Sequence, residues 1–366
     1  MHLNYRRRRI IKLVFLIAVW TLIAFIALEV LFRLDYFLIS RNNRFARAER
    51  ERWAHTWNVW TPQFWKKKSW EYKSNVGFSG RYQGKEYQIR MNSFGFRSPE
   101  IKVPKPEDKF RILCLGGSTT NAGRTNRTTY PALLERKLNS YFRTDAIEVV
   151  NCGISGLLSG GEKKKLGEYF KLEPDLILEY NLVNDIWWRI YPDLIYGDFW
   201  KRTLIKSMLI SSLLGDYILS PVEVSGGLRE YTISNLEEIY RFCQARGVKV
   251  VFAGFIRPDA DRLDHEEKDF LNYSIRSFWN GKHDIDNYCQ WVDIYNQQLE
   301  EMCEKNGLFF IPANKHLTGG LDLFLDICHL KEEGIEKKAG IIFDHLKEYL
   351  SPFLEEKGII TARKLQ

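Results

Sequence analysis

Five short apolar runs constrain the fold of this 366-residue chain more than any other feature. Each is apolar along most of its length, as expected for a strand buried between helices on both faces of a parallel sheet. The runs cover residues 111–115, 147–151, 175–180, 248–253 and 308–311. Segments with helical spacing lie between and after them, near residues 129–143, 161–172, 229–246, 287–306 and 334–350. This alternation predicts one α/β domain around a five-stranded parallel sheet.

Two further segments stand outside the alternation. Residues 76–97 consist of short alternating runs punctuated by glycine, which predicts a hairpin. Residues 186–228, here called the insertion, hold no strand pattern but many aromatic and aliphatic side chains. A connection of that length inside a compact domain is often functional. We therefore expect the insertion to be either a lid or substrate platform, or a pair of additional packing helices.

The amino end carries the longest apolar run. Residues 13–28 contain no charged side chain, and the wider run 10–32 is long enough to cross a bilayer as a helix. Four arginines at residues 6–9 precede it, which favours a cytoplasmic amino terminus and an extracytoplasmic domain. A cleavable signal peptide is the alternative, but no clear small-x-small cleavage site follows the run. We expect an uncleaved signal anchor and hence a single-pass membrane protein.

Positive charge is concentrated beside this run. Residues 1–90 hold 18 Lys and Arg against 6 Asp and Glu, whereas residues 91–366 hold 36 against 40. A nucleic-acid-binding domain would carry the basic excess itself, so membrane lipid is the expected partner and nucleic acid is not. Trp53, Trp57 and Trp60 share one helical face in the basic segment. They either meet lipid headgroups or pack on the domain.

The stretch RILCLGGSTTNAG, residues 111–123, ends the first apolar run in two glycines and a serine. A phosphate loop would need a lysine after the glycines, and a dinucleotide fold would need G-x-G-x-x-G; this stretch has neither. Ligands of open α/β sheets bind beyond the carboxyl ends of the strands, where Ser118 is expected. A serine is a poor nucleophile without a base, so serine chemistry requires a base elsewhere in the chain.

The stretch FLDICHLKEEG supplies a candidate base near the end of the domain, with Asp326 three residues before His329. Asp326 can then orient His329 so that Nε2 faces Ser118, although a capping aspartate beside a surface histidine would give the same spacing. Two more groups follow strand ends: Gly153 in NCGISG offers a backbone N–H, and Asn184 in YNLVNDIWW offers a side-chain amide. Together with the Ser118 N–H, such donors can stabilise the oxyanion of an acyl transfer.

These four blocks, in this order, resemble the SGNH (GDSL-type) hydrolase superfamily over roughly residues 90–350. The stretch NSFGFRSPE at residues 92–100 is similar to the lead-in of membrane-tethered or exported members. The resemblance implies a three-layer flavodoxin-like fold and a serine esterase that acts on an acylated lipid or envelope glycan without a metal or organic cofactor. It also implies a triad and an oxyanion hole. The triad is Ser118, Asp326 and His329, and the oxyanion donors are Ser118, Gly153 and Asn184.

Two positions depart from the family pattern. Gly117 stands where the family has the aspartate of GDS, and Asn181 stands where it has the first glycine of GxND. Neither position supplies a triad or oxyanion group, so we expect an active esterase. Two alternatives stay open: an O-acyltransferase that passes the acyl group to an envelope polysaccharide, and a catalytically silent envelope-assembly protein on the same fold.

The whole chain is then expected to have three parts. A cytoplasmic tail and signal anchor cover residues 1–34, a basic, Trp-rich membrane-proximal linker covers 35–75, and the hydrolase domain covers 76–355 and includes the insertion. The six cysteines show no metal-ligand spacing, and the sequence leaves their pairing open.

Overall fold

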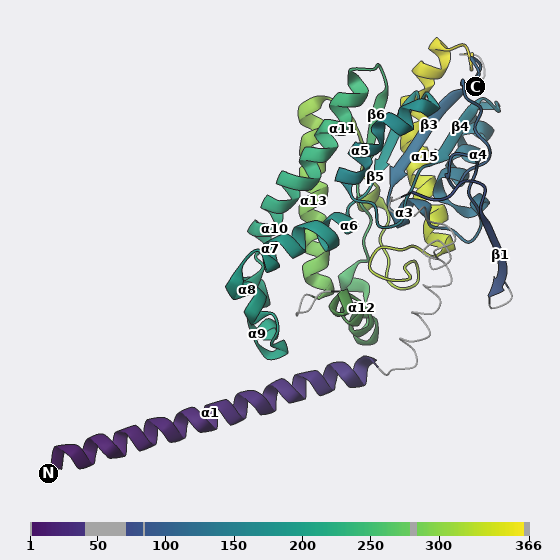
Figure 1. The fold of residues 1–366 in the computed structure, drawn as a ribbon. Coiled ribbons are helices and arrows are strands. Elements are labelled where there is room, and N and C mark those ends of the chain that lie inside the picture. Colours follow the sequence, from purple (N-terminus) through teal and green to yellow (C-terminus); the bar gives the residue numbers. More distant parts are fainter. Residues whose placement is uncertain (1, 41–70, 83–84, 279–283, 362–366) are drawn as a thin grey trace.

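A sheet of five parallel strands forms the centre of the molecule (Figure 1). The structure, a computed structural model, describes residues 2–40, 71–82, 85–278 and 284–361. The strands are β3 (Phe110–Gly116), β4 (Ile147–Asn151), β5 (Leu176–Tyr180), β6 (Lys249–Ala253) and β7 (Phe309–Ile311). Their spatial order is β4-β3-β5-β6-β7, which is the flavodoxin-like order. The predicted fold class is confirmed, and each strand lies within one residue of its predicted bounds at either end.

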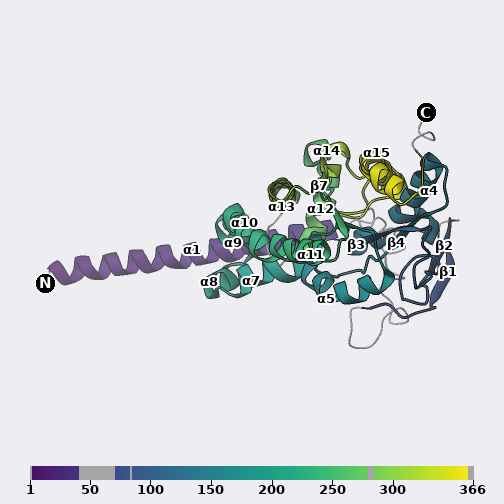
Figure 2. The same cartoon turned by 90° about the horizontal axis from the view of Figure 1, so that it is seen from above.

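Helices cover both faces of this sheet (Figure 2). On one face, α4 (Tyr130–Phe142) packs against α15 (Glu332–Glu356), and on the other α5 (Ser159–Tyr169) packs against α11 (Ser234–Gln244). The long helix α13 (Ile285–Asn306) precedes β7. All residues of β3 and β5 are buried, which explains why most of their positions are apolar.

Local signals set the ends of the longest predicted helix. Asp284 caps the start of α13, where its side chain accepts a hydrogen bond from Asn287 N–H at 3.0 Å. Gly307 ends the helix with φ of 63°, a left-handed conformation that glycine adopts without a steric penalty. The structure therefore starts α13 two residues before its predicted start and ends it where predicted.

The amino-terminal hairpin of the domain is also confirmed, because β1 (Gly77–Tyr82) and β2 (Lys85–Arg90) pair in antiparallel. The insertion is helical: it holds α7 (Tyr191–Tyr196), α8 (Phe199–Leu204), α9 (Met208–Ile218) and α10 (Pro221–Gly227). Further helices are α3 (Ser118–Asn121), α6 (Val183–Asp185), α12 (His265–Phe278) and α14 (Ala313–His316). The expected additional helices are thus present in the insertion, and its action as a lid stays a prediction.

A single long helix, α1 (His2–Ser40), extends from the domain (Figure 1). Its segment Arg6–Asp35 has a mean hydropathy of 2.7, and within the described ranges it is the one helix long and apolar enough to cross a membrane or to act as a signal sequence. Trp53, Trp57 and Trp60 lie outside the described residues. All six cysteines are buried free thiols in this structure.

Candidate active site

Ser118 lies directly beyond the carboxyl end of β3, in a sharp turn over residues 116–121 that we call the serine turn. Gly116 makes the turn with φ of 147°, and a Cβ there would lie 2.2 Å from Thr120 Oγ1 and 2.4 Å from the Tyr180 carbonyl oxygen. Only glycine fits this approach. The Thr120 hydroxyl reaches the carbonyl oxygens of Leu115 and Tyr180 at 3.3 Å each, which ties the turn to β3 and β5.

Ser118, His329 and Asp326 form one hydrogen-bonded row, although His329 is 211 residues from Ser118 in sequence. His329 Nε2 lies 2.8 Å from Ser118 Oγ, and His329 Nδ1 lies 2.8 Å from Asp326 Oδ2. Asp326 is buried, and the His329 side chain is 14% exposed. This geometry places a base within proton-transfer reach of a serine and an acid behind the base.

A tight turn between β7 and α15 holds both residues of the D-x-x-H pair. Asp326 Oδ1 accepts hydrogen bonds from the N–H groups of Cys328 at 2.8 Å and His329 at 2.7 Å. The residue before Asp326 also closes this turn, because Leu325 N–H donates to the His329 carbonyl at 2.7 Å. The three-residue spacing therefore lets one carboxylate hold the turn with one oxygen and orient the imidazole with the other.

The structure also brings Gly153 and Asn184 against the serine turn. A Cβ at Gly153 would lie 3.0 Å from the Gly117 carbonyl oxygen and 2.6 Å from Asn121 N, so glycine is required for this close approach. Both proposed donors have partners: Gly153 N–H donates to Asn151 Oδ1 at 3.1 Å, and Asn184 Nδ2 donates to the Leu157 carbonyl at 3.0 Å. The Asn184 amide has a second N–H to offer, whereas the single Gly153 N–H must be shared or released by Asn151.

The two departures from the family pattern meet in space. A Cβ at Gly117 would lie 2.5 Å from Asn184 Nδ2 and 3.3 Å from Asn181 Oδ1. Asn181 is 2% exposed, and its Nδ2 donates to the same Leu157 carbonyl as Asn184, at 3.0 Å. Asn181 thus fills space beside Gly117. A longer side chain at position 117 would displace Asn184.

Two buried basic side chains contact the serine turn and the residues that follow it, and sequence reasoning assigned neither. Arg97 donates to the carbonyl oxygens of Asn121 and Gly123 at 2.7 Å each, and burial lowers the pKa of Arg97 to about 10. Lys338 of α15 lies 3.4 Å from the Thr119 carbonyl oxygen and 3.2 Å from the centre of the Tyr180 ring. Burial lowers the pKa of the Lys338 ammonium well below its usual range. Arg97 belongs to the NSFGFRSPE stretch, whereas nothing in the sequence around Lys338 signals its place.

Three further acids lie in the layer beneath the site. Glu162 of α5, Glu179 of β5 and Asp185 of α6 are at most 1% exposed. Burial raises the pKa of Glu162 well above its usual range, that of Glu179 to about 8 and that of Asp185 to about 6. Asp185 Oδ1 accepts a hydrogen bond from Ser159 N–H at 2.9 Å, whereas the Glu162 carboxyl contacts the Asn181 amide and is hydrogen-bonded to the Glu179 carboxyl. The last two carboxyls therefore keep at least one proton between them at neutral pH.

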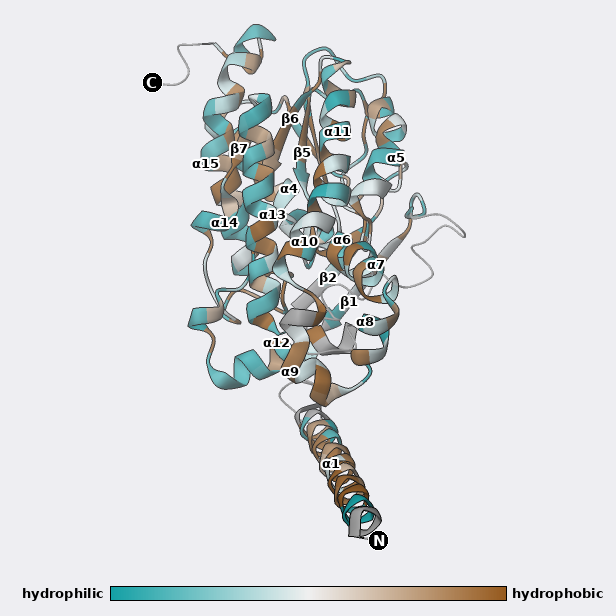
Figure 3. Cartoon of the chain, turned by 90° about the vertical axis from the view of Figure 1, so that its left-hand side faces the viewer, coloured by the Kyte–Doolittle hydropathy of each residue, from teal (hydrophilic) through white to brown (hydrophobic). Residues whose placement is uncertain are grey.

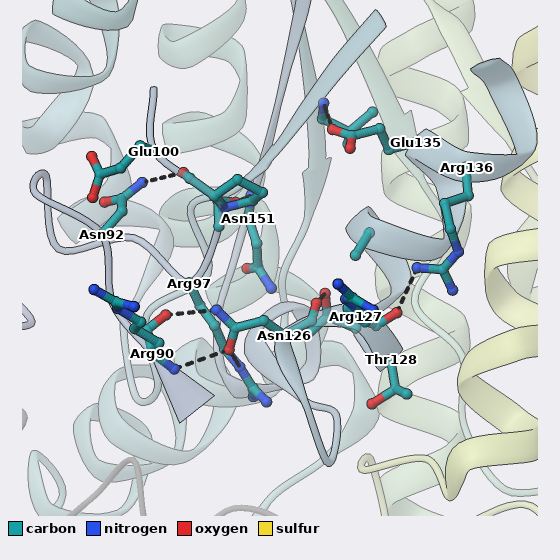
Figure 4. Close-up of a pocket in the computed structure, with 15 residues that line it drawn as sticks. Arg90, Asn92, Arg97, Glu100, Asn126, Arg127, Thr128, Glu135, Arg136 and Asn151 are labelled. Atoms are coloured by element: carbon teal, nitrogen blue, oxygen red, sulfur yellow. Dashed lines mark hydrogen bonds between the residues drawn. The ribbon is translucent and has the colours of Figure 1, made fainter. Parts of the chain in front are cut away.

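An arginine-rich cleft of about 740 Å³ is lined in part by Arg97, the residue that donates to the Asn121 carbonyl of the serine turn (Figure 4). Arg90, Arg97, Arg127 and Arg136 line it together with Glu100 and Glu135. Neither Ser118 nor His329 lines this cleft, and its lining includes no paired nucleophile and base. We therefore place the candidate chemistry at the Ser118 row rather than in the arginine-rich cleft.

One group of metal-ligand type gathers within the described ranges, namely Asp326, Cys328 and His329, whose donor atoms lie within 4.8 Å of one another. Both oxygens of Asp326 already accept hydrogen bonds within this turn. The group therefore fits an internally satisfied turn better than a set of metal ligands.

A sequence profile described as the GDSL-like Lipase/Acylhydrolase family matches residues 114–337. The matched segment contains all five residues that the sequence predicted for the site: Ser118, Gly153, Asn184, Asp326 and His329. Among curated proteins, no relative matches the sequence at a significant level.

Solved structures with a similar chain path include three described as lipases or esterases. A GDSL-like lipase from Bacteroides thetaiotaomicron is 15% identical, covers 70% of this chain and 93% of its own, and has a TM-score of 0.39. A carbohydrate acetylesterase family member from Sinorhizobium meliloti is 12% identical, with 66% and 99% covered and a TM-score of 0.43. A psychrotrophic esterase from a Pseudoalteromonas species is 16% identical, with 66% and 98% covered and a TM-score of 0.39.

Proposed function

The chain belongs to the GDSL-like lipase/acylhydrolase family and hydrolyses ester bonds, and we propose that it does so as a membrane-anchored serine esterase with Ser118 as nucleophile. The observation that carries the proposal is the 2.8 Å separation of His329 Nε2 from Ser118 Oγ, with Asp326 Oδ2 on the other ring nitrogen. A hydroxyl and a base at this distance can exchange a proton as the hydroxyl attacks.

The reaction follows from this row of groups. Ser118 Oγ attacks the ester carbonyl carbon while its proton passes to His329 Nε2. Collapse of the tetrahedral intermediate breaks the carbon–oxygen bond to the alcohol, which leaves with the proton from His329. Water then attacks the acyl-serine, again giving its proton to His329, and the acid departs as Ser118 is restored. Asp326 keeps Nδ1 as the protonated nitrogen and stabilises the imidazolium formed in each half-reaction.

The oxyanion would bind where Ser118 N–H, Gly153 N–H and the Asn184 amide meet. Ser118 is the first residue of α3, so its N–H has no partner within the helix. The Asn184 amide can donate one N–H to Leu157 and the other to the oxyanion, whereas Gly153 N–H becomes available as Asn151 gives it up. Removing one such donor typically costs about 100- to 1000-fold in kcat.

The substrate and the placement of the chain are part of the same proposal. The apolar helix α1 anchors the protein, the four arginines before the apolar run keep its amino end in the cytoplasm, and the domain faces the other side. The ester is then carried by a lipid or a cell-envelope glycan on that side. The hydrogen-bonded row favours this enzyme over the catalytically silent alternative, while an acyltransferase would share the triad and differ in the acceptor.

Labelling with a fluorophosphonate probe tests the nucleophile. We expect the wild-type protein to label and the Ser118→Ala variant to lose labelling and ester hydrolysis. The matched control Ser140→Ala changes an exposed serine on α4 and should label like wild type. Labelling of folded Ser118→Ala at the wild-type rate would show that another residue is the nucleophile.

A further inference from the structure

The insertion carries most of the domain's exposed apolar side chains. Outside α1, ten large apolar side chains are exposed in the described parts of the chain, and seven of them belong to residues 186–228. They are Trp188, Tyr196, Phe199, Trp200, Leu213, Leu214 and Val222. Exposed fractions are 81% for Val222, 70% for Trp200 and 69% for Leu213. An apolar concentration of this kind on one segment marks an interaction surface rather than ordinary solvent-facing surface.

This segment lies at the end of the domain nearest α1. Figures 1 and 3 both place α9 beside α1, and residues of the two helices are in contact. In Figure 3 hydrophobic residues of α9 stand directly above the hydrophobic α1. Neighbouring helices α7, α8 and α9 contact one another in turn, so the exposed aromatic residues of α8 belong to the same end.

A carboxylate of α1 joins the two elements. Glu29 Oε2 accepts hydrogen bonds from Ser207 Oγ at 2.8 Å and Leu209 N–H at 2.9 Å, and Oε1 accepts from Met208 N–H at 3.1 Å. These donors are the cap and the first turn of α9, where backbone N–H groups have no partner within the helix. Arg33 adds a hydrogen bond to the Lys206 carbonyl at 3.0 Å.

Helix geometry gives the depth, relative to a membrane, of the junction between Glu29 and the start of α9. Residues 10–28 of α1 span about 28 Å at 1.5 Å per residue, close to the roughly 30 Å hydrocarbon thickness of a bilayer. Glu29 is the first acid after this run, so it would lie at the outer boundary of the hydrocarbon. The start of α9 lies at the same level because Glu29 caps it. Lys201, Arg202 and Lys206 stand among the aromatic residues, as in segments that lie at a lipid headgroup layer.

We propose that α8 and α9 dock into the outer surface of the bilayer that α1 crosses, with Phe199, Trp200 and Leu213 against lipid and Glu29 holding α9 to the span. The inference rests on the anchoring proposed above. It assigns the insertion to lipid rather than to a second copy of the chain, because the apolar surface continues from α9 onto α1, which itself requires lipid along its length. Two attachments, the span and the insertion, then restrict how the domain tilts over the membrane.

Spin-label accessibility in the full-length protein, reconstituted in phosphatidylcholine–phosphatidylglycerol nanodiscs, tests the docking. Labels are placed on Phe199→Cys and Leu213→Cys, and on the matched exposed control Ser140→Cys of α4. All native thiols are buried. We expect labels at 199 and 213 to collide more with oxygen than with a water-soluble nickel chelate, and the label at 140 to show the reverse. Nickel-favoured collisions at 199 and 213 would overturn the docking, as would spin–spin broadening there, which would indicate a second copy.

A second variant tests the junction. Glu29→Gln keeps the size of the side chain but removes the charge that accepts three hydrogen bonds. We expect it to lower the oxygen-to-nickel collision ratio at position 213, and an unchanged ratio would show that Glu29 does not hold α9. Fluorophosphonate labelling of the same samples reports on Ser118 independently. A labelled protein with water-exposed positions 199 and 213 therefore refutes the docking alone, whereas membrane-embedded labels without fluorophosphonate reactivity refute the esterase alone.

Discussion

Two groups of buried acids in this domain are held in opposite ways. Asp326 is 4% exposed and receives hydrogen bonds on both oxygens, from two backbone N–H groups and the His329 ring. Glu162 and Glu179 are at least as deeply buried, but their carboxyls are hydrogen-bonded to each other, so one of the two must carry a proton. The first arrangement suits a carboxylate that must stay charged and oriented, whereas the second suits carboxyls that stay protonated. Burial alone therefore does not identify a catalytic acid; the number and direction of its donors do.

The largest effect on the rate is expected from Asp326→Asn, which alters the hydrogen bonds that the Asp326 carboxylate accepts. An amide facing His329 Nδ1 no longer favours the tautomer in which Nε2 accepts the Ser118 proton, so kcat should fall on the order of 10³- to 10⁴-fold with the fold retained. The rate on a soluble activated ester measures this. Asp322→Asn, in the same loop but exposed, is the matched control and should stay close to wild type. A fall of less than about tenfold in Asp326→Asn would remove Asp326 from the triad.

Gly117→Ala should lower kcat by about 100-fold, because the added Cβ would lie 2.5 Å from Asn184 Nδ2 and would push an oxyanion donor away. Gly167→Ala is the matched control, since nothing lies within 4 Å of a Cβ there. Equal rates for the two variants would show that the Asn184 amide takes no part in the reaction.

Glu179→Gln probes the second arrangement and should change stability rather than rate. Burial raises the pKa of Glu179 to about 8 in the folded protein, against about 4.3 when unfolded. The protonated carboxyl favours the folded state. Its contribution to the free energy of unfolding is therefore complete below the unfolded pKa and is lost as pH rises through 8. A neutral glutamine does not lose stability in this way. We therefore expect Glu179→Gln to raise the free energy of unfolding by on the order of a few kcal/mol at pH 9 and to change it little at pH 5.

Thermal unfolding from pH 5 to 9 measures this difference as a Tm that falls less steeply with pH in Glu179→Gln than in wild type. Glu336→Gln, an exposed glutamate on α15, is the matched control and should keep the wild-type slope. If both variants give the wild-type slope, Glu179 is ionised in the folded state and the contrast with Asp326 disappears.

Much of the fold and of the site could be predicted from local pattern. The strands β3 and β5 are buried along their whole length, and their positions are apolar except for Arg111, Glu179 and the strand ends, which is a pattern that marks a buried parallel strand. The D-x-x-H spacing encodes a turn in which Asp326 and His329 bond directly. By contrast, Lys338 could not be assigned, because a lysine in a helix is ordinarily solvated and this one is buried by tertiary packing of α15 against α4 and the Tyr180 ring.

The sequence by itself determined the order of the elements, the apolar helix and the candidate residues for the chemistry, because apolar periodicity and short motifs reflect interactions between near neighbours. Only the tertiary structure decided that His329 meets Ser118 across 211 residues, that Gly117 leaves room for Asn184, and that Glu29 caps α9. These contacts join strand ends, helices and loops far apart along the chain. Their distances depend on how the whole sheet and its helices pack, which no local pattern records.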